Sequence, residues 1–179
     1  PGWGPVAPLL DPHPPAELRG HAADLRAASD GLNLDPALDV VDTSFYTPPR
    51  LAELMWDTLV DAGFDGGRVL DLGCGSGRFR AAAPSGLPIR YTGVDRDPIS
   101  TRIAELLYPT AQIITGNALR VRNGSGYDAV IGNVPFSASH EYTDVFGRVP
   151  LHLAIALYGV RALRPVSYTH LTLPTSDLV

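Results

Sequence analysis

The chain contains 179 residues, of which 45% are hydrophobic and 18% are charged, and its net charge is −5. This composition predicts one compact domain, because it supplies enough apolar side chains for a core and too little charge for a disordered chain. The longest apolar stretches, such as Leu153–Leu157, fall far short of the roughly 20 residues that span a bilayer. We therefore expect no membrane partner.

The single cysteine, Cys74, excludes an intramolecular disulfide framework and a multi-cysteine zinc site. It fits a reducing compartment, and we expect a cytoplasmic protein. The five histidines are never three or four residues apart, so no helix face presents two imidazoles to a metal ion. No metal site is predicted.

The two ends of the chain differ from its middle. Residues 1–42 are rich in Pro, Ala and Asp, and they predict a linker with one short helix over 15–29. The N-terminus has no initiating Met and no signal peptide, so we expect the chain to begin within a longer protein. Residues 165–175 resemble translated sequencing-adapter DNA that follows a transposon end. Residues 166–179 are therefore expected to be a non-native tail.

Residues 43–165 alternate short apolar runs with helical segments, which is typical of an α/β domain with parallel strands and crossover helices. Asp97-Pro98 combines an N-cap residue with Pro at the first helical position, so it marks the start of one of these helices. Strands are expected at 68–71, 90–95, 111–115 and 127–132, and helices at 49–62, 97–108 and 151–163.

A glycine-rich loop follows the first predicted strand, with glycines at 73, 75 and 77. Glycine permits positive φ and lets the backbone lie directly against a ligand, near the amides of a helix N-terminus. The second strand ends in Asp95, where a carboxylate can accept hydrogen bonds from both hydroxyls of a ribose. Together the loop and Asp95 predict a cofactor that contains adenosine.

The identity of that cofactor depends on two residues that flank the glycines. Arg78 stands where a dinucleotide-binding loop needs its third glycine. Asp71 would repel a pyrophosphate and attract an ammonium group, and S-adenosylmethionine carries an amino group and no phosphate. The segment Val69–Gly77 resembles the first motif of the class I S-adenosylmethionine-dependent methyltransferases. This resemblance implies S-adenosyl-L-methionine as the cofactor.

The same resemblance implies a Rossmann-like sheet with the strand order 3-2-1-4-5-7-6. Residues 1–165 would supply only the first four strands, in the order 3-2-1-4. Strand four would then form an exposed apolar edge. We expect a truncated domain that is inactive by itself.

The fourth predicted strand runs into residues 132–136, which resemble the catalytic loop of amino-group methyltransferases, usually Asn-Pro-Pro followed by an aromatic residue. An exocyclic amine is a poor nucleophile until acceptors hold its hydrogens and favour a pyramidal nitrogen. The resemblance implies that the Asn133 side-chain oxygen and the Val134 carbonyl are these acceptors. It also implies that Pro135 stiffens the loop and that Phe136 stacks on a flipped base.

Two further segments resemble cofactor motifs of N6-adenine DNA methyltransferases. Tyr46 and Thr47 would contact the methionine end of the cofactor, although Thr47 before a Pro-initiated helix is equally consistent with helix capping. Asn117 and Ala118 match the adenine-binding loop, and the amide oxygen of Asn117 can accept a hydrogen bond from the adenine amino group. The predicted cofactor-binding residues are Tyr46, Thr47, Asp71, Gly73, Cys74, Gly75, Gly77, Asp95, Arg96, Asn117 and Ala118.

The motif order and the Gly-Asn-Val-Pro-Phe variant resemble the methyltransferase portion of large plasmid- and phage-borne proteins that fuse methyltransferase and helicase domains. This resemblance implies methyl transfer to adenine N6 in DNA and a helicase domain in the full-length protein. Because an acidic chain without Lys attracts DNA weakly, DNA contacts are expected mainly from regions C-terminal to this chain. The alternatives are a protein-glutamine or RNA methyltransferase, a non-catalytic module of a helicase, and a nicotinamide-dependent oxidoreductase.

Overall fold

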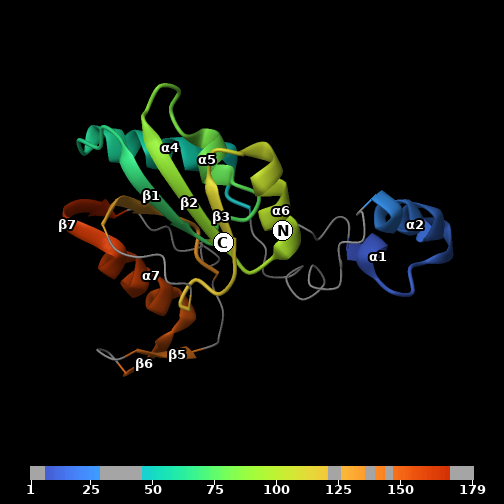
Figure 1. Ribbon diagram of the computed structural model, residues 1–179. Helices are drawn as coiled ribbons and strands as arrows, with labels where there is room; N and C mark the ends of the chain where they lie inside the picture. Colours follow the sequence, from blue (N-terminus) through green and yellow to red (C-terminus); the bar gives the residue numbers. More distant parts are fainter. Residues whose placement is uncertain (1–6, 29–45, 121–125, 136–139, 144–146, 170–179) are drawn as a thin grey trace.

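Figure 1 shows the computed structural model, which describes residues 7–28, 46–120, 126–135, 140–143 and 147–169. The first described segment is helical and comprises α1 (Ala7–Leu10), the 3-10 helix η2 (Ala16–Leu18) and α2 (Arg19–Ala28). Leu10 and Ala22 are buried where α1 and α2 pack together. The helix that the sequence predicts over 15–29 is thus confirmed.

A parallel sheet in the order β3-β2-β1-β4-β7 forms the centre of the structure. Its first four strands lie within one residue of the predicted positions, and their order matches the predicted 3-2-1-4 arrangement of a Rossmann-like α/β fold. The strands are β1 (Gly67–Leu72), β2 (Ile89–Asp95), β3 (Gln112–Thr115), β4 (Tyr127–Ile131) and β7 (Leu163–Thr169).

The fifth strand corrects the expectation that strand four forms the edge of the sheet. β7 pairs in parallel with β4, with Leu163 opposite Tyr127 and Tyr168 opposite Ala129. It takes the place that the class I strand order gives to strand five, and it supplies hydrogen-bond partners to backbone groups of β4 that an edge would leave unpaired. Residues 166–169 of β7 belong to the predicted non-native tail, whose origin stays a prediction. The rest of that tail, 170–179, lies outside the described residues.

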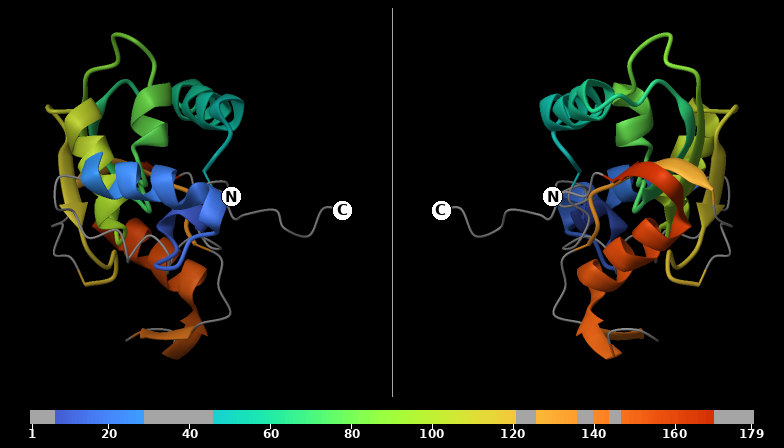
Figure 2. Two further views of the ribbon diagram at one scale, coloured as in Figure 1. Left: turned by 90° about the vertical axis from the view of Figure 1, so that its right-hand side faces the viewer. Right: turned by 90° about the vertical axis from the view of Figure 1, so that its left-hand side faces the viewer.

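Helices cover both faces of the sheet, as Figure 2 shows. Trp56 is fully buried on one face, in a cluster with Val69, and its indole Nε1 donates a hydrogen bond to the Phe79 carbonyl (2.8 Å). On the other face, Ile155 packs in a second cluster with Leu70. The helices of the first face are α4 (Pro49–Asp61) and α5 (Arg78–Ala82), α7 (Leu151–Ala162) covers the second, and α6 (Pro98–Leu107) packs along β2 and β3.

A two-stranded antiparallel hairpin, β5 (His140–Thr143) and β6 (Gly147–Pro150), stands between β4 and α7. The sequence does not predict it. Because α7 returns the chain from the carboxyl end of β4 to the start of the parallel strand β7, its N-terminus and the hairpin lie toward the carboxyl edge of the sheet (Figure 1). Within the described ranges, no helix is both long and apolar enough to cross a membrane.

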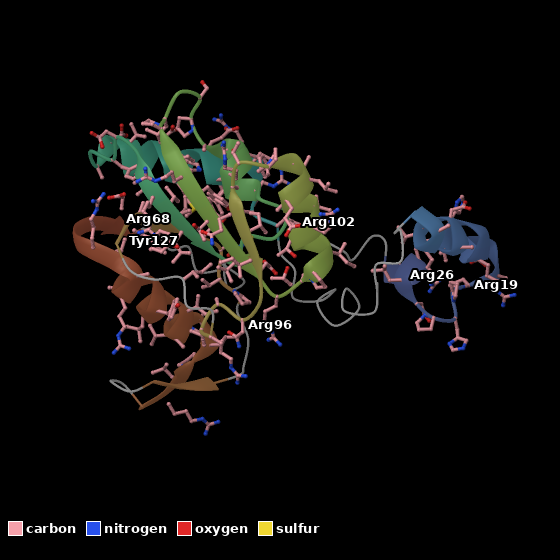
Figure 3. The ribbon with its side chains drawn as sticks, in the orientation of Figure 1. Arg19, Arg26, Arg68, Arg96, Arg102 and Tyr127 are labelled. Carbon is pink, nitrogen blue, oxygen red and sulfur yellow. The ribbon has the colours of Figure 1, made fainter. Side chains whose placement is uncertain are left out.

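The amino-terminal ends of the strands, opposite the carboxyl edge, are held together by charged and aromatic side chains, some of which are labelled in Figure 3. The Arg68 guanidinium lies 4.4 Å from the centre of the Tyr127 ring, which joins β1 to β4. Asp128 accepts a hydrogen bond from the Arg68 amide (2.7 Å) and forms an ion pair with Arg164 of β7. These contacts fix the starts of three strands and leave the carboxyl edge for a ligand.

Candidate functional site

The glycine loop after β1 folds over the end of β2. The amides of Gly73 and Cys74 both donate to the Val94 carbonyl, at 2.8 and 3.1 Å. Gly73 has a φ of 98°, and a Cβ atom there would lie 3.2 Å from the carbonyl oxygen of Asn133. The absence of a side chain at Gly73 therefore lets the loop that follows β4 lie directly against the glycine loop.

Asp95 ends β2 and is held by two backbone amides. Its Oδ2 accepts a hydrogen bond from Gly75 (2.7 Å), and its Oδ1 accepts one from Asp97 (2.9 Å). Burial raises the pKa of Asp95, and these amides partly oppose that effect. The Arg96 amide adds a third such hydrogen bond, so of the roughly four acceptor positions of a carboxylate about one remains for a ligand hydroxyl.

The segment before α4 lies across the glycine loop and α6. The Tyr46 hydroxyl lies 3.1 Å from the Ser100 hydroxyl, which donates to Asp97 Oδ2 (2.6 Å), so Tyr46 donates to Ser100. A Cβ atom on Gly75 would lie 3.2 Å from the Tyr46 ring. Thr47 is buried, with 4% of its surface exposed. The structure thus brings Tyr46, which the sequence places far upstream, onto the glycine loop.

The loop after β3 is tied to the end of β2, since the Gly116 amide donates to the Asp95 carbonyl (2.7 Å). Asn117 Oδ1 accepts a hydrogen bond from the Leu119 amide (2.9 Å), so the oxygen predicted to bind adenine also caps a local turn. Ala118 is buried, whereas Arg96 is exposed and is labelled in Figure 3. Asn117 and Ala118 join the same edge, and Arg96 faces solvent.

The loop after β4 is anchored by apolar burial. Val134 is fully buried in the cluster on the α7 face, which contributes about 1.5–3 kcal/mol relative to an exposed side chain. Val134 stands where the loops that this segment resembles carry a proline, and its burial gives this loop a source of rigidity besides Pro135. The side-chain oxygen of Asn133 is buried and Pro135 is partly exposed. Phe136 lies outside the described residues.

Asp71 lies beneath the glycine loop, and its side chain is fully buried. Its Oδ2 accepts a hydrogen bond from the Tyr91 hydroxyl, and its Oδ1 has no hydrogen-bond partner among the described residues. Burial raises the pKa of Asp71 to about 7; the hydrogen bond from Tyr91 lowers it, and the neighbouring charge of Asp95 raises it. Direct contact between Asp71 and a ligand ammonium stays a prediction, since no surface of this side chain is exposed.

Cys74 is also buried, and its Sγ is 3.6 Å from the Gly75 carbonyl oxygen. Burial and the charges of Asp71 and Asp95 raise the pKa of the thiol well above its ordinary value. A thiol that keeps its proton is a weak nucleophile, so the Cys74 thiol is poorly suited to attack a substrate, and contact between Cys74 and the cofactor stays a prediction.

Two residues of this region escape prediction from the sequence, Tyr91 and Ser100. Tyr91 lies in β2 between Arg90 and Thr92, and nothing in this local sequence indicates a hydrogen bond to Asp71. Ser100 follows Asp97-Pro98, so the capping pattern was visible, but its contact with Tyr46 depends on tertiary structure.

The comparisons with known proteins agree with this architecture. A protein of Listeria monocytogenes described as a class I S-adenosylmethionine-dependent methyltransferase superimposes with a TM-score of 0.57 and 15% identity, over 87% of this chain and 58% of that one. A protein of Pyrococcus horikoshii described as an RNA methyltransferase gives 0.52 and 21%, over 67% and 58%. The chain has the class I methyltransferase fold. It spans less than two thirds of either structure, and identities this low show the fold alone.

No protein-family model matches the chain. Among curated proteins, "Defense against restriction protein B" of Escherichia phage P1 is 34% identical over 97 residues, which is 52% of this chain and 4% of the phage protein. The chain therefore corresponds to a small part of a much longer relative.

Proposed function

We propose that this chain binds S-adenosylmethionine and takes part in methyl transfer to an exocyclic amino group, adenine N6 in DNA. The observation that carries the proposal is the close approach of Gly73 to the Asn133 carbonyl, where a Cβ atom on residue 73 would leave only 3.2 Å. It brings the loop that resembles the amine-binding motif against the loop that resembles the cofactor motif. A methyl donor bound at the glycine loop and an amine bound at the loop after β4 would therefore be neighbours.

The residues at the carboxyl edge fit the cofactor on structural grounds. Asp95, held by backbone amides at the end of β2, can still accept a hydrogen bond from a ribose hydroxyl. Asp71 places a carboxylate with an unpartnered oxygen, among the described residues, beneath the loop, which suits a ligand of positive charge. In a dinucleotide-binding loop the third glycine lets the following helix approach the strand closely. Here that position is Arg78, the first residue of α5, which disfavours a dinucleotide. These features favour S-adenosylmethionine over a nicotinamide dinucleotide.

When bound, S-adenosylmethionine supplies an electrophilic methyl group on a sulfonium sulfur. Asn133 Oδ1 and the Val134 carbonyl would each accept a hydrogen bond from the target amine, and so favour the pyramidal nitrogen that can attack. The buried Val134 side chain holds both acceptors in position.

The choice of DNA rests on the resemblance of the Asn-Val-Pro-Phe sequence to adenine-specific loops. A protein-glutamine or RNA methyltransferase would use the same acceptors, and a non-catalytic module of a helicase would keep the fold without turnover. The net charge of −5 offers little attraction to phosphates, so we propose that a helicase or other region of the full-length protein supplies most DNA contacts.

The test is to incubate the protein with methyl-labelled S-adenosylmethionine and, in separate reactions, duplex DNA, RNA and a protein mixture. Both this chain and a longer form that includes neighbouring regions should be used. With the longer form we expect label in DNA, recovered as N6-methyladenine, and about a hundred- to thousandfold slower labelling with Asn133→Ala. Label in RNA or glutamine would replace the substrate assignment. Binding of the cofactor without transfer to any substrate by the longer form would support the non-catalytic module.

A further inference from the structure

Tyr91 and Asp71 form a buried pair, and the proposed chemistry assigns no role to Tyr91. In the sheet register Tyr91 stands opposite Val69, two residues before Asp71, so both side chains lie on the same face of adjacent strands. The Tyr91 hydroxyl donates to Asp71 Oδ2. A Cβ atom on Gly132 would lie 3.1 Å from Asp71 Oδ1, which places that oxygen beside the strand end that leads into Asn133.

This arrangement fixes the direction of the carboxylate. With Oδ2 held by Tyr91 on β2, Oδ1 faces β4, where no described residue gives it a hydrogen bond. A buried carboxylate with one oxygen unpartnered is costly when ionised and tolerable when protonated. The pair therefore holds a proton readily and gives it up when positive charge arrives nearby.

No described cation lies among the groups that shift the pKa values of the pair, so none of them supplies the positive charge that would ionise Asp71. The groups that shift the pKa of Asp71 are Tyr91 and Asp95, both from β2. Cys74 of the glycine loop and Tyr108 at the end of α6 raise the pKa of Tyr91. β4 brings the backbone of Gly132. All the titratable members are acids, so added positive charge would have to come from a ligand.

We propose that Tyr91 is a positioning residue that acts through Asp71, and that the pair beneath the glycine loop favours the cationic cofactor over its uncharged product. This inference rests on the proposed function. S-adenosylmethionine carries a sulfonium and an ammonium against one carboxylate, a net charge of +1, whereas S-adenosylhomocysteine has lost the sulfonium and carries no net charge. Both ligands carry the ammonium, so the sulfonium is what distinguishes them. S-adenosylmethionine should therefore expel the proton of Asp71 more fully than S-adenosylhomocysteine, through a charge–charge interaction across the loop.

The experiment measures the affinity of the full chain for both ligands by calorimetry between pH 6 and pH 8. Because Asp71 titrates near 7, its ionised fraction rises from about a tenth to about nine tenths over this range. We expect the affinity for S-adenosylmethionine to rise about tenfold, and that for S-adenosylhomocysteine by less than about threefold. Asp95 can also respond to the charge of the ligand, so the assignment to Asp71 depends on the Tyr91→Phe variant, which removes a hydrogen bond from Asp71.

Two further measurements separate a positioning role from a structural one. Binding of S-adenosylmethionine at pH 7 should release about half a proton, measured from the binding heat in buffers of different ionisation enthalpy. Tyr91→Phe should move the midpoint of the pH profile upward by about one pH unit, because the hydrogen bond that favours the carboxylate is lost. Tyr127→Phe is the matched control, since it removes a buried hydroxyl from the strand start near Arg68, at the opposite edge.

Parallel pH profiles for the two ligands, or an unmoved midpoint in Tyr91→Phe, would overturn this inference and leave the proposed function standing. The profile comparison uses the unaltered chain, so it holds even if Tyr91→Phe folds poorly. If neither S-adenosylmethionine nor S-adenosylhomocysteine bound at any pH, the proposed function would be overturned and this inference with it.

Discussion

Replacement of Asp71 by Asn should change how the stability of the protein depends on pH. An unfolded aspartate loses its proton near 3.8, whereas the folded Asp71 keeps its proton up to about 7. Between these two values the folded state binds the additional proton, so the contribution of Asp71 to stability is complete below 3.8 and is lost as the pH rises through 7. The difference corresponds to about 4 kcal/mol of unfolding free energy.

The measurement compares urea denaturation of the wild type and Asp71→Asn at pH 4 and pH 8. Trp56 is fully buried, so its fluorescence reports unfolding of the sheet domain. The buried amide of Asn carries its own cost of about 1–3 kcal/mol, but that cost is independent of pH. The stability of the variant relative to the wild type should therefore rise by about 4 kcal/mol from pH 4 to pH 8. Asp57→Asn, at an exposed carboxylate of α4, is the control.

A relative stability that changes by less than about 1 kcal/mol across this range would refute the reasoning, because Asp71 would then titrate as an ordinary aspartate. The control Asp57→Asn should change in relative stability by less than about 1 kcal/mol over the same pH range, because its side chain is exposed.

Three further predictions concern single positions. Asp95→Ala should weaken S-adenosylmethionine binding about ten- to hundredfold by calorimetry, since a charge-assisted hydrogen bond contributes about 1.5–3 kcal/mol; unchanged affinity would remove Asp95 from the site. Asn133→Ala should leave that affinity nearly intact while turnover falls about a hundred- to thousandfold, and equal losses in both would indicate a structural turn. Gly77→Ala should lower the melting temperature more than Gly86→Ala: both have positive φ, but only at Gly77 would the new Cβ meet a side chain, the Tyr108 ring at 2.5 Å. Equal effects would mean that the ring moves aside freely.

Local patterns account for most of what the sequence predicts correctly. Asp97 accepts a hydrogen bond from the Ile99 amide at the start of α6, as the Asp-Pro pair indicates. The four apolar runs become β1 to β4 because each is bounded by turn residues and is too short for a buried helix. Such signals are contained within a few neighbouring residues.

The features that the sequence does not predict depend on pairing between distant segments. β7 follows α7 without a break, and the change at Leu163 from helix to strand is decided by the open edge of β4. The contact between Tyr91 and Asp71 depends on the register of β1 against β2, which a one-residue shift would abolish. Register is a property of the assembled sheet, so neither residue could be paired from its own neighbourhood.

The two aspartates at the ends of β1 and β2 have raised pKa values chiefly because both are buried; the charge of Asp95 raises that of Asp71 further, and the charge of Asp97 raises that of Asp95. A fold selected for stability alone would place apolar residues there, since a buried carboxylate destabilises the folded state above its pKa. Their cost is offset when a ligand of positive charge binds between the loops, because it then favours the ionised form of both. If the proposed function is correct, the cofactor-free protein should be least stable at alkaline pH. Cofactor binding should stabilise the protein most under the same condition.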